Sequence, residues 1–126
     1  MQTYLQGACQ IAELADLPIT IILKNSTNVM IIPGVAESLL EISCSEEPVF
    51  IVVGCCTDIC ILQTALTLKA KCDEVNRSSR IIVPSSLVDT FDGPGHDAEQ
   101  ASAWALTNLK LNGIEVVSEI EDLYEL

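Results

Sequence analysis

Two hydrophobic periods divide this chain into predicted helices and strands. Apolar residues spaced three to four positions apart predict amphipathic helices, and short runs rich in Ile and Val predict buried strands. The expected helices span residues 4–17, 34–43, 61–72 and 98–111. The expected strands span residues 19–23, 49–54, 80–84 and 114–117.

The order of these elements predicts the fold class. Helices and strands alternate along the whole chain, which favours a parallel sheet with helices on both faces. We therefore expect one α/β domain over residues 1–126, a three-layer α/β/α, Rossmann-like arrangement with about four strands. The run at 49–54 is apolar on both faces, as expected for a strand covered by helices on each side.

Charge and cysteine content limit the partners and the compartment. Six basic residues against 18 acidic ones give a net charge of −12, which argues against nucleic acid and anionic membranes as partners. The six cysteines lie mostly in apolar runs, so we expect free thiols in a reducing, cytoplasmic compartment. No apolar run approaches the roughly 18 residues of a membrane span.

The segment from Gly54 to Cys60 carries the main chemical signal. It joins a predicted buried strand to a predicted helix, so the thiol of Cys60 lies in the first helical turn. The amide groups there favour negative charge on sulfur, which suits a nucleophile. The alternative for Cys60 is a small buried apolar residue. Thr57 or Asp58 is expected to cap the helix.

Other polar residues at strand ends are weaker candidates. Lys24 follows five apolar residues, and it is either a cation that stabilises the thiolate or a solvated lysine at a strand end. His96 is expected to be a loop or capping residue, and Asp89 a structural acid in a turn. With a single histidine and no CxxC pair we expect no metal site. Thiol redox chemistry at Cys55, Cys56 or Cys60 is a further alternative.

Two motifs resemble those of the isochorismatase-like cysteine hydrolases, the family that includes nicotinamidases. Residues 52–60, Val-Val-Gly-Cys-Cys-Thr-Asp-Ile-Cys, are similar to the family's nucleophile motif, and residues 24–30 are similar to its lysine motif. Met30 stands where that family usually has an aromatic residue. The similarity covers the chain from about residue 18 to its end.

The resemblance implies a mechanism and a set of site residues. Cys60 would attack a small molecule at an amide-type C–N bond or a vinyl ether, assisted by Lys24, with no cofactor and no metal. The family's cis peptide maps to Cys55–Cys56, and the backbone N–H groups of Cys56 and Cys60 would form the oxyanion hole. Met30 and Thr57 would contact the substrate.

The resemblance also has a gap. The family's catalytic aspartate ends a strand well before the lysine, and nothing upstream of Lys24 resembles that strand; Asp16 lies in the wrong context. We therefore expect a truncated hydrolase with weak or no turnover, or a non-catalytic oligomeric, small-molecule-binding module with the hydrolase fold. Without the family's first strand, a central position of the sheet would be vacant. The chain would then be a fragment, would close into a compact four-stranded sheet, or would form a homo-oligomer that covers the vacant position.

Overall fold

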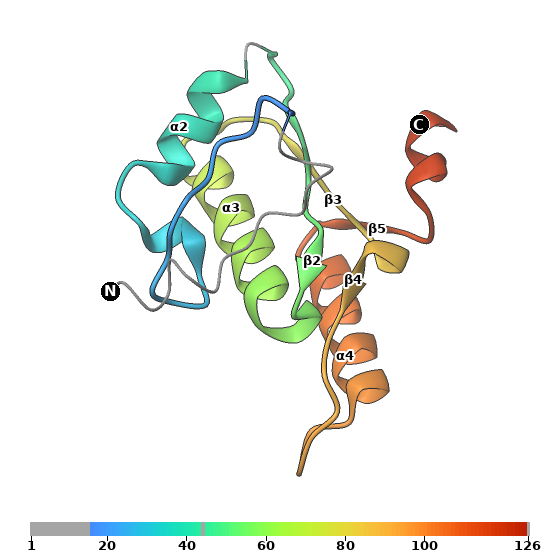
Figure 1. Ribbon diagram of the computed structural model, residues 1–126. Coiled ribbons are helices and arrows are strands. Elements are labelled where there is room, and N and C mark those ends of the chain that lie inside the picture. Colours follow the sequence, from blue (N-terminus) through green and yellow to red (C-terminus); the bar gives the residue numbers. More distant parts are fainter. Residues whose placement is uncertain (1–15, 44, 126) are drawn as a thin grey trace.

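The computed structural model describes residues 16–43 and 45–125, which form a mixed α/β fold with parallel strands (Figure 1). The predicted helix at 4–17 falls almost wholly outside these residues. The helical elements are η2 (Val29–Ile31), α2 (Val35–Ile42), η3 (Thr57–Ile61), α3 (Leu62–Glu74), η4 (Ser85–Leu87), α4 (Ala98–Leu111) and η5 (Ile120–Glu125). The strands are β1 (Val49–Ile51), β2 (Gly54–Cys55), β3 (Arg80–Pro84), β4 (Val88–Asp89) and β5 (Glu115–Val117).

Parallel pairing organises the strands into two sheets. The larger sheet has the order β1-β3-β5, with Phe50 beside Ile81 and Val83 beside Val116. The smaller sheet pairs β2 with β4 and sets Cys55 beside Asp89. The cysteine segment therefore continues from the end of β1 and is held in place by the chain that leaves β3.

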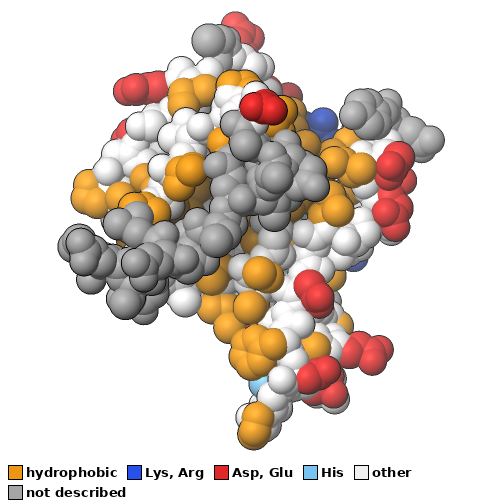
Figure 2. Space-filling view, viewed as in Figure 1, with side chains coloured by type: hydrophobic (Ala, Val, Ile, Leu, Met, Phe, Trp, Pro, Cys, Tyr) orange, Lys and Arg blue, Asp and Glu red, His pale blue; other side chains and the backbone are white. Residues whose placement is uncertain are grey.

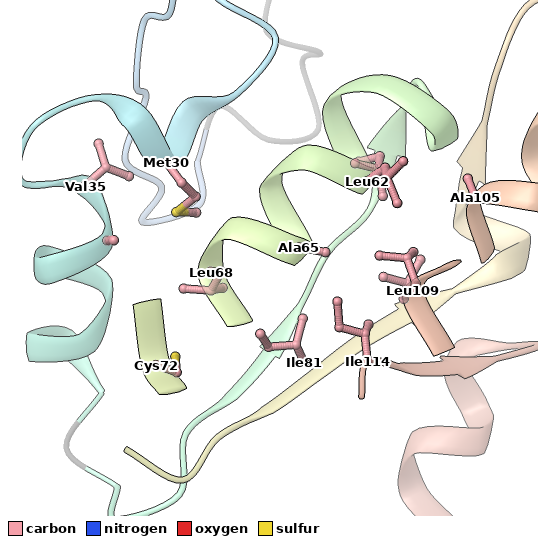
Figure 3. Packing of buried hydrophobic residues seen from close by; sticks show 13 residues of the cluster. Met30, Val35, Leu62, Ala65, Leu68, Cys72, Ile81, Ala105, Leu109 and Ile114 are labelled. Carbon is pink, nitrogen blue, oxygen red and sulfur yellow. The ribbon is translucent and has the colours of Figure 1, made fainter. Parts of the chain in front are cut away.

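The core lies on the face of the larger sheet that carries Ile81 and Val83. Side chains of α2, α3 and α4 join this face in one cluster, shown in part in Figure 3. Its buried members include Val35, Ala36, Leu62, Ala65, Leu68, Cys72, Ala105, Leu109 and Ile114. The cluster is aliphatic and supports η3, because Ile61 and Leu62 anchor the start of α3 in it.

The predicted helices 34–43, 61–72 and 98–111 are confirmed as α2, η3 with α3, and α4. Asp97 caps α4, since its carboxylate accepts a hydrogen bond of 2.9 Å from the Gln100 N–H. Gly113 follows α4 with a φ of 81°, a left-handed conformation that glycine adopts without strain. Within α2, Ala36 is buried and Ile42 is exposed.

The predicted buried strand at 19–23 is wrong. This segment is irregular, and Ile19, Ile21 and Leu23 are 45%, 64% and 61% exposed. A β-branched run becomes a strand only beside a neighbouring strand, and no described strand lies alongside it. The larger sheet therefore has three strands, where four in one sheet were expected.

The predicted strand at 49–54 is interrupted, and its burial was overestimated. The structure divides it into β1 and β2, and Val49 and Ile51 remain about half exposed. The short strand β4 was expected to be loop. Across the described residues, no helix combines the length and apolar character needed to cross a membrane.

Candidate active site

The cysteine segment forms a strand–turn–helix junction. β2 ends at Cys55, the peptide bond between Cys55 and Cys56 is cis, as the resemblance implies, and the π-helical turn η3 starts at Thr57. Gly54 has a φ of 118°, a backbone conformation in which any side chain would be strained. Cys60 is partly buried within η3, among the first amide groups of the continuous helix η3–α3.

Lys24 reaches the candidate nucleophile. Its Nζ lies 3.8 Å from the Sγ of Cys60 and donates a hydrogen bond of 3.0 Å to the carbonyl oxygen of Ser26. The two residues are 36 positions apart in the sequence, so this contact is a product of the fold. A cation at this distance stabilises a negative charge on the sulfur.

Side chains from the segment after Lys24 fasten it to α3. Thr27 donates a hydrogen bond of 2.9 Å to Gln63, and the Asn28 amide donates one of 2.9 Å to Thr67. The Asn28 side-chain oxygen also accepts a hydrogen bond of 3.1 Å from the Met30 N–H and so caps η2. Sequence reasoning missed these contacts, because a polar loop carries no signal for the helix it will meet.

A second polar cluster lies on the other side of η3. The Asp58 carboxylate accepts a hydrogen bond of 2.6 Å from the Thr90 hydroxyl and lies 2.7 Å from Nε2 of His96. Nδ1 of His96 lies 2.7 Å from the carbonyl oxygen of Phe91, and the Phe91 ring stacks on the imidazole at 4.3 Å. Both ring nitrogens of His96 face acceptors, so the doubly protonated imidazolium satisfies the arrangement best.

Electrostatics in this cluster favour the ion pair. The hydrogen bond to Asp58, followed by the one to the Phe91 carbonyl, raises the pKa of His96. Burial alone would raise the pKa of Asp58, but hydrogen bonds from His96 and Thr90 outweigh burial, and the net effect lowers it. Asp58 therefore ties the Phe91–His96 loop to η3, and it does not cap the helix as predicted.

The expected role of His96 as a loop residue agrees with this geometry. Its function as an anchor across 38 positions of sequence could not be read from its neighbours alone. The available signal was modest: a lone histidine before a helix and an acid in the first turn of another helix.

The residues expected to contact substrate are buried. Met30 is 6% exposed within the core, and Thr57 is completely buried. The Thr57 hydroxyl has no hydrogen-bond partner among the described residues. The Thr57 side chain cannot contact a substrate from outside without a rearrangement, and Met30 lines a groove beside β1, whereas Cys56 and Cys60 are partly accessible.

The described part of the chain lacks a general base beside the thiol. No described carboxylate contacts Cys60 or Lys24, and the Asp58 carboxylate is occupied by Thr90 and His96. Within residues 16–43 and 45–125, no cluster of His, Cys, Asp and Glu could hold a metal ion. Cys55, Cys56, Cys60 and Cys72 are free thiols.

This geometry suits nucleophilic chemistry at one sulfur, with a lysine as its electrostatic partner. Comparisons of the chain with protein-family models, with curated proteins and with solved structures gave no significant match.

Proposed function

We propose that the chain is an isochorismatase-like cysteine hydrolase with weak activity, acting on an amide-type C–N bond or a vinyl ether of a small molecule. The observation that carries this proposal is the 3.8 Å approach of Lys24 Nζ to Cys60 Sγ, at a helix start that follows a strand. The resemblance of residues 24–30 and 52–60 supports it. The three-layer, isochorismatase-like arrangement belongs to the same proposal.

In the amide reaction, Cys60 Sγ forms a bond to the carbonyl carbon. The carbonyl oxygen becomes an oxyanion that the N–H groups of Cys56 and Cys60 stabilise. Collapse of this intermediate breaks the C–N bond, the leaving nitrogen takes a proton from solvent, and water then hydrolyses the thioester. The Lys24 ammonium group stabilises the negative charge on the Cys60 sulfur before the attack.

Proton transfer limits this reaction. Without a positioned acid or base, the rate falls by about 10²–10⁴ relative to a complete site. The described residues place no carboxylate at the thiol, so turnover is expected to be slow and acylation of Cys60 to be easier to detect than product.

The test is a panel of small primary amides, ureido compounds and vinyl ethers, assayed with the wild-type chain and with Cys60→Ala. Slow hydrolysis that disappears in Cys60→Ala, with a thioester on Cys60 seen by intact mass, is the expected result. Identical background rates in both proteins, with no adduct, would reject the hydrolase.

The alternative function is a non-catalytic, oligomeric module that binds a small molecule. The absence of a described carboxylate at Cys60 favours it. In that case Cys60→Ala binds the same compounds with unchanged affinity, whereas a catalytic thiol would make binding and turnover depend on Cys60.

A further inference from the structure

Among the residues that the structure describes, the strand β1 has a free edge. It is hydrogen-bonded to β3 on one side, and no described segment pairs with its other side. Edge strands in natural proteins are usually protected by a charge, a proline or a bulge. Residues 49–53 read Val-Phe-Ile-Val-Val and include no charged residue and no proline. An edge of this kind is a site for another strand.

The backbone groups that face outward can be assigned. The Val52 N–H donates to the Ile82 carbonyl at 2.9 Å, and the Arg80 N–H donates to the Pro48 carbonyl at 2.9 Å. In an edge strand, the backbone groups of alternate residues bond to the neighbouring strand. The backbone N–H and C=O groups of residues 48, 50 and 52, where present, therefore point toward β3. The N–H and C=O groups of Val49, Ile51 and Val53 therefore point away from β3.

The side chains along this edge are also accessible. Val49, Ile51 and Val53 are 51%, 47% and 48% exposed. A groove of about 390 Å³ borders the strand and includes Met30 and Leu39 in its lining. Hydrophobic side chains reach the surface at several places in the view of Figure 2. Both the polar backbone and the apolar side chains of β1 are thus open to a partner.

We propose that residues 49–53, which are β1 and the two residues after it, pair in antiparallel fashion with residues 49–53 of a second copy of this chain, about a twofold axis at Ile51. In this register Ile51 meets Ile51 of the second copy, and Val49 meets Val53 of the second copy. Each is a pair in which both N–H groups and both C=O groups bond across the interface. Phe50 and Val52 of each copy stay packed against the core of their own chain.

A second copy fits this edge because the edge is self-complementary. Exposed apolar residues lie symmetrically about Ile51, so the same patch serves both partners, as a twofold interface requires. The chain carries a net charge of −12, yet the paired residues carry none. Two copies repel each other over the rest of their surfaces, and salt screens that repulsion. Association is therefore expected to strengthen with salt, whereas a basic protein partner would bind more weakly.

The first test is the oligomeric state of the full chain by analytical ultracentrifugation, at several protein and salt concentrations. A dimer that tightens between low and high salt is expected. Ile51→Lys places two like charges at the axis and should weaken dimerisation at least tenfold. The control is Leu111→Lys, at a position 83% exposed on α4, which should leave it unchanged. A monomer under all conditions, or a dimer indifferent to Ile51→Lys, overturns the proposal.

The second test fixes the register. Directly paired residues in the proposed arrangement have Cα atoms about 5.5 Å apart, which a disulfide can span. Ile51→Cys should cross-link through the two introduced thiols under mild oxidation, as mapped by peptide mass spectrometry. The matched control, Val75→Cys, is 60% exposed in the loop after α3 and should not cross-link. Equal cross-linking in both variants would overturn the β1 pairing even if a dimer exists. Neither test depends on hydrolase activity.

Discussion

At the scale of single residues, the candidate site depends on long-range contacts that a motif can suggest and only a fold can provide. Cys60 and Lys24 could be singled out from the sequence, because Cys60 lies in the first turn of a predicted helix and Lys24 is a charged residue that directly follows five apolar positions. The anchor between Asp58 and His96 could not, because each residue alone has an ordinary local explanation. Met30 and Thr57 are expected to contact the substrate, and the structure shows both of them as buried residues.

The first prediction concerns Lys24. Two opposite unit charges 4 Å apart attract each other by about 1 kcal/mol in water, which corresponds to about fivefold in the rate of a reaction that depends on this attraction. Lys24→Met should therefore slow alkylation of Cys60 by iodoacetamide about fivefold, measured by peptide mass spectrometry. Lys71→Met, on the exposed side of α3 near Glu37, is the matched control. Equal alkylation rates in the two variants would show that Lys24 does not activate Cys60.

At the scale of elements, helices were predicted better than strands. α2 and α4 match their expected bounds to within about a residue, because a helix makes its own hydrogen bonds and its sequence carries its caps. Residues 19–23 have strand composition, yet the structure provides no partner strand for them. β4 has two residues and no periodicity to detect, although its pairing with β2 brings Thr90 to Asp58.

The second prediction concerns the loop that His96 anchors. His96 is the single histidine, so its imidazole signal in proton NMR can be titrated without overlap. Its pKa should lie above the ordinary value of 6.5, and Asp58→Asn should lower it, because Asp58 is the main cause of the shift. A titration midpoint of His96 at or below 6.5, or one that Asp58→Asn does not change, would contradict the ion pair.

The same pair has a defined effect on stability. Since folding raises the pKa of His96, its contribution is fully present below about pH 6.5 and is lost as pH rises through the folded pKa. Since folding lowers the pKa of Asp58, its contribution is present above about pH 3.8 and is lost as pH falls through the folded pKa. Urea unfolding of wild type and His96→Gln should differ most between these limits and converge at alkaline pH.

At the scale of the whole molecule, a well-packed cluster coexists with open apolar surface. Ala65, Leu68, Val83 and Leu109 are at most 1% exposed, while β1 and residues 19–23 leave large aliphatic side chains in contact with water. A sequence pattern shows which residues are apolar but not which of them find a cover, because that depends on neighbours brought from elsewhere. The aliphatic residues of the sequence therefore indicate a core, but they overestimate how much of the chain is buried in it.

The third prediction compares two leucines that differ in burial. Leu68→Ala, at the centre of the cluster, should lower the free energy of unfolding by about 2–5 kcal/mol. Leu111→Ala, at the exposed end of α4, should change it by less than about 0.5 kcal/mol. Chemical denaturation at one pH measures both. Similar losses would mean that the cluster around α3 does not hold the fold together.

The central claim, that the fold makes Cys60 a nucleophile, is tested most directly by competition among the six cysteines for a limiting amount of iodoacetamide. Cys55 is exposed and Cys60 only partly so, which means that accessibility alone would label Cys55 before Cys60. If Lys24 and the helix start activate the thiol, Cys60 is labelled first and Cys72, buried in the core, last. Faster labelling of Cys55, or of Cys9 or Cys44, than of Cys60 would contradict the claim that the fold makes Cys60 a nucleophile.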